Sequence, residues 1–335
     1  MTGPVSSGGD QPRADSGDPA PGGSGQDAEP TPTGLSAAVL AVSLWGGGNV
    51  LVAAVPIDGL SLAFLRLWLA FALYAGVMLS RGVRLRRHQF RTVLMGGFFF
   101  GADLITFYLA LQYTSVAIAV TVSALQPVGV LAAAALLFGE RVTRTHLMLG
   151  TAAVVGVMMV VLGAGGDGAA TLTGNLWAVG ALICWAGYFI GSKSARRHVD
   201  NFAYLVWINL IGGVMLTPVI AIVGLDADRA ISWSGLGWVA LIVAVPGSGH
   251  VIMNWAHRHT TLTSTSLLTL AMPVISTVLA ALFLDQGVVA VQVIGIAITL
   301  AALAAVTAYN ARQPAVLQRK APQGSDRHPG SRVTP

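Results

Sequence analysis

One stretch of this chain occurs twice, and that duplication constrains the fold more than any other feature. Residues 108–142 read YLALQYTSVAIAVTVSALQPVGVLAAAALLFGERV, an apolar run with a proline near its middle and a charged end. After a shift of 146 residues, Pro127 falls on Pro273 and Glu140 falls on Gln286. An internal repeat of this length predicts two related structural units.

An earlier segment repeats with a shift of 140 residues. LWGGGNV begins at Leu44 and CWAGYFI begins at Cys184, so Trp45 falls on Trp185. The first repeat is expected to cover residues 35–164 and the second to cover residues 174–309.

Composition places both repeats in lipid. Hydrophobic residues make up 54% of the chain and charged residues 10%, with a mean hydropathy of +0.71, whereas soluble proteins carry about 25% charged residues. The single cysteine, Cys184, excludes a disulfide or a cysteine-based metal cluster within one chain, and we expect no metal and no cofactor. The basic residues sit in short connections, so the pI near 9.8 does not indicate a nucleic-acid partner.

The lengths of the apolar runs predict an all-α membrane protein with ten transmembrane helices, because a hydrocarbon core of ~30 Å needs roughly 20 apolar residues per helix. The expected spans are 35–54, 60–79, 92–112, 116–137, 146–164, 174–193, 202–224, 236–256, 262–284 and 289–309. The polar ends, residues 1–33 and 310–335, are predicted to be disordered tails.

Lysine and arginine in the connections predict the orientation. The basic side carries Arg81, Arg84, Arg86, Arg87, Arg91, Arg141, Arg144, Lys193, Arg196, Arg197, Arg258, Arg312, Arg319, Lys320, Arg327 and Arg332, and the other side carries Arg229. The positive-inside rule then puts both termini in the cytoplasm, and we expect a multi-pass protein of the inner (plasma) membrane. Five spans per half is an odd number, so the repeats are predicted to be inverted.

Several motifs make the chain resemble the EamA-type branch of the drug/metabolite transporter superfamily. They are LWGGGN at 44–49, FLR at 64–66, ALQYTS followed by ALQPVGVLAAAALLFGERVT, and the glycine pair at 150 and 156. The resemblance covers roughly residues 35–309. It implies two inverted five-helix repeats, a central cavity, and movement of small metabolites such as amino acids, often outward.

Two charged residues lie within expected spans. Asp103 has Thr106 one turn away on the same helix face, and a charge at the bilayer centre costs about 2.5–3.5 kcal/mol on insertion scales. Asp103 is therefore a candidate partner for a substrate amine or a candidate proton carrier; the alternative is a structural carboxyl. For Arg66 we favour a structural role, in which it snorkels to the outer interface, caps carbonyls or pairs with Asp103.

His250 and Asn254 are four residues apart, on one face of the eighth span, just after a break at Pro246. By the 146-residue shift, Asp103 corresponds to Gly249. We expect His250 and Asn254 to line a cavity, with proton coupling through His250 as a further candidate role; the alternative is a histidine that only packs.

Pro127 and Pro273 each remove a backbone hydrogen bond and predict paired helix kinks. Carbonyls freed at membrane depth need protein or water partners, so the kinks are candidates for cavity walls, or are bends that only serve packing. Gln126 adds a donor and an acceptor beside the first kink.

Aromatic residues recur on the first span of each half. Trp45 with Asn49, and Trp185 with Tyr188, are at helical spacing and could hold a planar or cationic ligand in a cavity. Core packing or anchoring at the membrane interface is the alternative.

Together these features predict a secondary carrier that exports a small metabolite, an amino acid or related solute, by alternating access. A multidrug or quaternary-amine efflux carrier is the alternative within the same class. An intramembrane enzyme or a non-transporting assembly partner is the alternative of another class, but neither H-E-x-x-H nor a usable G-x-S-x-G is present, so no catalytic residue is assigned. The expected partners are a small-molecule substrate and the lipid bilayer; coupling to protons, the substrate and the oligomeric state stay open.

Overall fold

The computed structural model describes residues 31–114, 116–163, 171–283 and 287–320, and this part of the chain contains helices but no strand. Most of the two predicted tails, residues 1–30 and 321–335, lies outside the described residues. The last helix differs from expectation, because it continues beyond Asn310 to Lys320. Most residues of this segment, ARQPAVLQRK, are good helix formers, and Pro314 is the exception.

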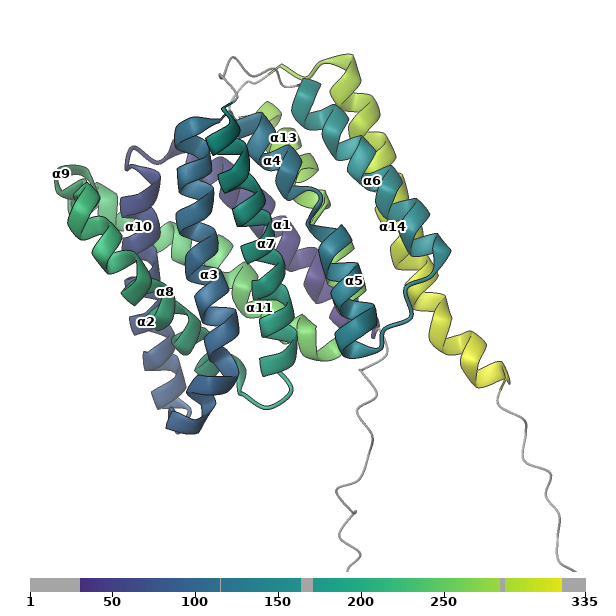
Figure 1. Ribbon diagram of the computed structural model, residues 1–335, viewed down its shortest axis with the longest axis horizontal. Helices are drawn as coiled ribbons and strands as arrows, with labels where there is room; N and C mark the ends of the chain where they lie inside the picture. Colours follow the sequence, from purple (N-terminus) through teal and green to yellow (C-terminus); the bar gives the residue numbers. More distant parts are fainter. Residues whose placement is uncertain (1–30, 115, 164–170, 284–286, 321–335) are drawn as a thin grey trace, which may run out of the picture.

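The described helices form ten spans that are long and apolar enough to cross a membrane, which confirms the all-α fold with two inverted five-helix repeats (Figure 1). The first half contains α1 (Pro32–Ala54), α2 (Gly59–Ser80), α3 (Arg87–Tyr113), α4 (Val116–Ser123), α5 (Gln126–Phe138) and α6 (Arg144–Gly163). The second half contains α7 (Leu172–Ala195), α8 (Asn201–Val223), α9 (Ala227–Ala230), α10 (Trp233–Ala244), α11 (Pro246–His259), α12 (Leu262–Leu268), α13 (Ala271–Phe283) and α14 (Ala290–Lys320). Three spans consist of two helices each: α4 with α5, α10 with α11, and α12 with α13.

The two halves interlock instead of forming separate lobes. The first helix of each half packs against the third span of the other half, α1 on α11 and α7 on α3. The second spans, α2 and α8, pack on each other, as do the fifth spans, α6 and α14. The core therefore lies between the halves.

A matching pair of contacts, which we call the threonine clamps, fixes the two ends of this interface. Thr31 caps α1 and its hydroxyl donates to the carbonyl of His259, at the end of α11, over 2.8 Å. Thr171 caps α7 and donates in the same way to the carbonyl of Tyr113, at the end of α3, over 2.6 Å. The shifts that relate the two halves also relate these contacts.

One carboxylate adds a contact between the halves that has no described counterpart. Glu140, just after α5, accepts hydrogen bonds from the backbone N–H groups of Leu262 (2.6 Å) and Thr263 (2.8 Å), at the start of α12. A negative charge at a helix N-terminus is favourable because the first N–H groups have no partner within the helix. Gln286, which corresponds to Glu140, lies outside the described residues.

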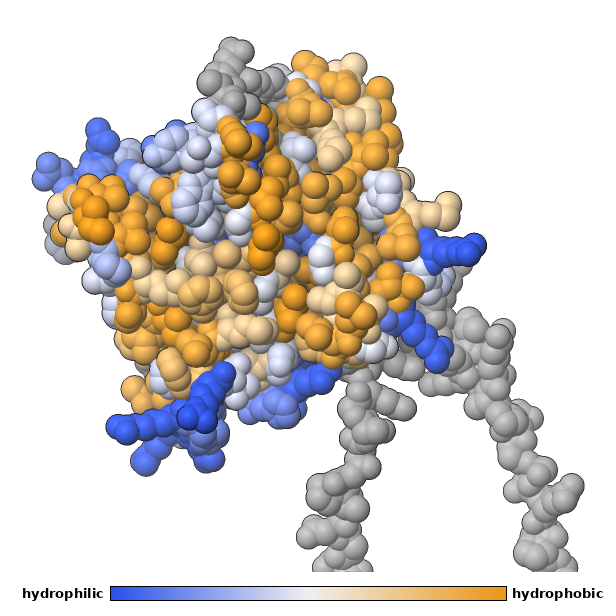
Figure 2. Space-filling model, in the orientation of Figure 1, coloured by the Kyte–Doolittle hydropathy of each residue, from blue (hydrophilic) through white to orange (hydrophobic). Residues whose placement is uncertain are grey.

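The surface fits a membrane protein. Figure 2 shows a broad apolar belt across the helices, with hydrophilic residues at its margins. Both ends of the described chain lie at the lower side in Figure 1. The connection between α2 and α3, which carries Arg81, Arg84 and Arg86, is at this same side.

The clamps require glycine where the helices approach most closely. A Cβ at position 174 would lie 2.5 Å from the carbonyl carbon of Tyr113 and 2.7 Å from the side chain of Thr114. Backbone atoms cannot move aside easily, so we expect Gly174→Ala to lower the free energy of unfolding by about 1–3 kcal/mol. Thermal unfolding in detergent measures this, with a thiol-reactive dye that reports exposure of the partly buried Cys184.

Gly76→Ala is the matched control, because a Cβ at position 76 of α2 meets nothing within 4 Å. Alanine stabilises a helix relative to glycine by about 1 kcal/mol, so this variant should keep or raise the unfolding midpoint. Equal midpoints for the two variants would contradict the close-packing argument.

Candidate functional site

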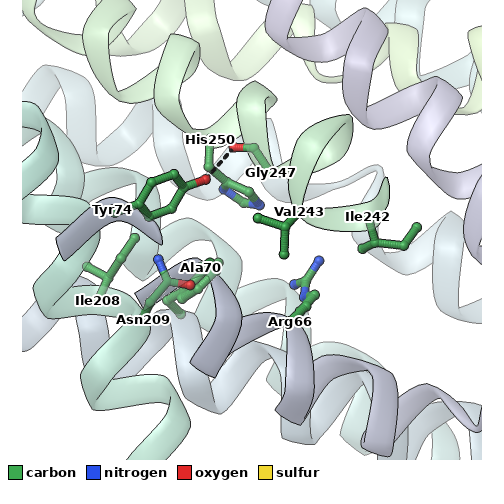
Figure 3. Close-up of a pocket in the computed structure, with 10 residues that line it drawn as sticks. Arg66, Ala70, Tyr74, Ile208, Asn209, Ile242, Val243, Gly247 and His250 are labelled. Atoms are coloured by element: carbon green, nitrogen blue, oxygen red, sulfur yellow. Dashed lines mark hydrogen bonds between the residues drawn. The ribbon is translucent and has the colours of Figure 1, made fainter. Parts of the chain in front are cut away.

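A pocket opens between the two halves near the middle of the bundle (Figure 3). It is lined by Arg66, Ala70, Tyr74, Phe100, Ile208, Asn209, Ile242, Val243, Gly247 and His250, from α2, α3, α8, α10 and α11. Its free volume is ≈ 20 Å³, about enough for one water molecule. The pocket is therefore too small to hold a metabolite in this conformation.

One face of α2 forms a wall of the pocket. Arg66, Ala70 and Tyr74 follow each other at four-residue spacing, so they line up on one side of the helix. The Tyr74 hydroxyl donates to the carbonyl of Gly247 over 3.1 Å, where α11 begins (Figure 3). Arg66 makes no hydrogen bond and no ion pair within 4.0 Å to any described residue, so its guanidinium keeps its donors available.

Two oxygen acceptors lie at or near the same pocket. The Nδ2 group of Asn209 donates to the carbonyl of Leu205 over 2.8 Å, so its Oδ1 atom remains as an acceptor at the pocket wall. Asp103 lies one turn from the pocket residue Phe100 on α3, and its charge interacts with that of Arg66. The carboxylate is partly buried and has no hydrogen-bond donor among the described residues. The site thus brings a cation and an anion near each other, without a hydrogen bond or a direct ion pair between them among the described residues.

An aromatic cluster from both halves surrounds His250. Trp45 of α1 and Trp185 of α7, which correspond by the 140-residue shift, meet edge to face with ring centroids 5.5 Å apart. The His250 ring lies 4.9 Å from Trp45 and 5.2 Å from Phe100. Gly249, the counterpart of Asp103, makes this possible, because a Cβ there would lie 2.7 Å from the indole of Trp45.

A chain of buried polar side chains leads away from His250. The Tyr188 hydroxyl lies 3.2 Å from His250 Nδ1, and Asn254 Nδ2 donates to Tyr188 over 3.1 Å. Asn254 Oδ1 accepts from the Ser192 hydroxyl, which also lies 2.7 Å from His257 Nδ1. We call these five residues the polar chain.

Arg196 supports the far end of the polar chain, just beyond α7. Its Nε group donates to the carbonyl of Asn254 over 3.1 Å, and a terminal nitrogen donates to the carbonyl of Val199. Burial lowers the pKa of Arg196 to about 10, against the opposing effect of Asp200. The guanidinium therefore remains charged at neutral pH.

Of the predicted site residues, His250 and Arg66 line the pocket. Thr106, Asn49 and Gln126 lie outside the pocket, the aromatic cluster and the polar chain. Thr106 donates to carbonyls of its own helix, at Ala102 (2.8 Å) and Asp103 (3.2 Å). Asn49 is exposed and donates to Ser276 of α13 over 3.1 Å. Gln126 is buried away from the pocket, where it accepts from Thr269 over 3.3 Å.

The predicted kink prolines lie at the three split spans. Pro127 is the second residue of α5, Pro273 lies in the first turn of α13, and Pro246 is the first residue of α11. The break at Pro246 adjoins the pocket. The other two breaks face each other through the Gln126–Thr269 hydrogen bond.

Sequence reasoning missed Tyr74, Asn209, Ser192 and His257. Each has a helical-spacing signal: Tyr74 is two four-residue steps from Arg66, and Ser192 is four residues after Tyr188. His257 continues the face that carries His250 and Asn254. What the sequence does not indicate is that the polar faces of α7 and α11 meet.

We expect Asn254→Ala to destabilise the protein by about 1–3 kcal/mol, because the change removes one hydrogen-bond partner from each of the buried side chains Ser192 and Tyr188. Thermal unfolding in detergent measures the loss. Asn49→Ala is the control, since Asn49 is exposed and makes a single side-chain hydrogen bond in the described structure. A midpoint for Asn254→Ala as high as that of the control would show that the polar chain adds no stability.

Comparison with known proteins gives a family and a fold. A sequence model of the EamA-like transporter family matches residues 32–162 and 172–308, which confirms the resemblance. A solved structure described only as "Crystal structure of protein" superposes with a TM-score of 0.71 at 22% identity, over 82% of this chain and 98% of the other. At this identity the match shows a shared fold alone. No curated protein matches the chain.

Proposed function

This chain belongs to the EamA-like transporter family, and from that premise we propose that it is a secondary carrier for a small zwitterionic metabolite such as an amino acid. It is a multi-pass membrane transporter of the drug/metabolite type. The observation that carries the choice of substrate is the pair Arg66 and Asp103. These opposite charges lie beside one pocket, and neither has a hydrogen-bond partner in the described structure.

The chemistry of the pocket supports this substrate class. A guanidinium binds carboxylates well, because its N–H groups match the two oxygens. Asp103 and Asn209 offer oxygen acceptors to an ammonium group. Charged groups at membrane depth are costly and are kept for function or pairing, so a ligand that carries both charges would compensate both.

The volume of the pocket supports alternating access. Binding sites for small molecules usually measure about 300–1,000 Å³, whereas the free volume here is ≈ 20 Å³. The helices must therefore separate before a metabolite can enter. Two inverted repeats supply a mechanism, since each half can rock against the other about a site between them.

The location of the protein and the direction of transport have separate support. Basic residues gather at the side where both described chain ends lie, which supports cytoplasmic termini in an inner membrane. The proposed outward direction rests on the family. Asp103 and His250 are the groups through which protons could be coupled, and a pH gradient in the assay addresses this point.

The decisive experiment is counterflow by the purified protein in liposomes, with a panel of labelled amino acids, amines and nucleobases, with and without a pH gradient. We expect exchange of at least one amino acid. Folded protein that exchanges none of these solutes would overturn the proposal.

Asp103→Asn should lower the counterflow rate at least tenfold, because the neutral amide cannot compensate an ammonium group in a desolvated site. Asp58→Asn is the matched control. Asp58 is exposed and caps α2 by accepting from Leu60 and Ser61, a task that asparagine performs equally well. A rate for Asp103→Asn equal to that of the control would remove Asp103 from the mechanism.

A second candidate, efflux of hydrophobic or quaternary amines, is favoured by the aromatic cluster. Trp45 and Trp185 contact each other and pack beside His250, and cations bind to aromatic faces. Competition separates the candidates: tetraphenylphosphonium should compete for counterflow in an amine carrier and leave amino-acid exchange unchanged in the carrier that we propose.

A further inference from the structure

The polar chain has a direction, which its hydrogen-bond geometry determines. Tyr188 and Ser192 lie four residues apart on α7, and His250, Asn254 and His257 follow each other on one face of α11. Each member has a fixed number of protons to donate. Following these protons along the chain shows which nitrogen of His250 carries hydrogen.

The Asn254 amide sets the direction. One of its terminal atoms lies 2.8 Å from the carbonyl of His250, and a carbonyl accepts hydrogen bonds only, so this atom must be the nitrogen. The same nitrogen lies 3.1 Å from the Tyr188 hydroxyl and donates its second hydrogen there. The amide oxygen accordingly accepts from Ser192.

Tyr188 passes this direction on to His250. Its oxygen already accepts from Asn254, so its own proton points to His250 Nδ1, 3.2 Å away. Nδ1 then carries no hydrogen, and the neutral ring carries it on Nε2. If Nδ1 were protonated instead, the Tyr188 hydroxyl would have no acceptor among the described residues.

The Nε2 atom of His250 is directed at the pocket. Nδ1 bonds to Tyr188, Trp45 and Phe100 pack against the ring in tilted and edge-to-face arrangements, and Nε2 has no hydrogen-bond partner among the described residues. Figure 3 shows the imidazole of His250 and the guanidinium of Arg66 extending into the same space. Both groups present N–H donors there.

We propose that His250 Nε2–H and the Arg66 guanidinium together bind the carboxylate of the substrate, and that Tyr188 is the positioning residue that keeps this hydrogen on Nε2. The inference rests on the proposed function and deepens it, because it gives the bound solute an orientation. The carboxylate faces α2 and α11, and the ammonium group faces Asp103 on α3. His250 becomes a specificity-determining residue, which selects carboxylates over neutral amides.

The first test reads the ring nitrogens directly and needs no transport. Full-length protein with ¹⁵N-labelled histidine is purified in detergent, and the His250 signals are identified by their loss in His250→Gln. NMR separates an N–H nitrogen from a bare ring nitrogen. We expect hydrogen on Nε2 in the native protein and a mixture of the two forms in Tyr188→Phe.

Tyr74→Phe is the matched control for this test. It also removes a hydroxyl at the pocket, but that hydroxyl donates to the carbonyl of Gly247 and not to His250, so the His250 signals should stay as in the native protein. Hydrogen on Nδ1 in the native protein, or a native His250 signal in Tyr188→Phe, would overturn the inference even if counterflow succeeds.

The second test measures selectivity. For an amino acid that the protein exchanges, we expect Tyr188→Phe to raise the Kd about tenfold, the loss of one hydrogen bond to a charged group. The Kd of the corresponding amino-acid amide should rise less, because a hydrogen bond to its neutral carbonyl is weaker than one to a carboxylate. Equal weakening of both ligands would overturn the carboxylate assignment, and so would competition by inorganic phosphate as strong as that by the amino acid. If no solute shows counterflow while the native protein carries hydrogen on His250 Nε2, the proposed function is wrong and the tautomer assignment still holds.

Discussion

Every backbone N–H and C=O group inside a bilayer needs a hydrogen-bond partner, and this structure depends on that requirement. Unbroken helices meet it by themselves, so the three split spans mark where protein groups must do so. Ser248 donates to the carbonyl of Ala244 at the break before α11. Ser123 and Thr269 donate to backbone carbonyls beside the other two breaks. The break at α11 also gives His250 its position beside the pocket, so the local cost of an interrupted helix coincides with the candidate site.

Much of the fold is predictable because hydrophobic length and internal repetition are properties of the sequence itself. The ten spans and their inversion follow from apolar run lengths and from an odd number of spans per repeat. Residues on one helix face, such as His250 and Asn254, are predictable for the same reason. The partner face, with Tyr188 and Ser192, is visible as a spacing but not as a contact. Knowing that α7 meets α11 requires the packing of helices that lie far apart along the chain, which periodicity does not encode.

The two halves share the same arrangement of helices, but they differ in the charged and polar residues at the candidate site. Asp103 corresponds to Gly249, and Arg66 corresponds to the buried Val206. The first half thus supplies both charges, and the second supplies the histidine and its polar chain. This division explains why the repeat predicts the frame of the molecule well and its site poorly. A shift between copies locates equivalent positions, but the functional residues are those that break the equivalence.

The threonine clamps have a consequence for energetics. Thr31 on His259 and Thr171 on Tyr113 are copies of one contact. In the carrier that we propose, opening at either membrane face would therefore break the same kind of hydrogen bond. The free-energy difference between the two conformations then depends on the few contacts that are present at one membrane face alone. The hydrogen bonds of Glu140 to the start of α12 are one such contact. A ligand shifts the populations of two conformations only by its differential affinity for them. If the two conformations of the proposed carrier are nearly equal in free energy, a weakly bound solute is enough to change which one is more populated.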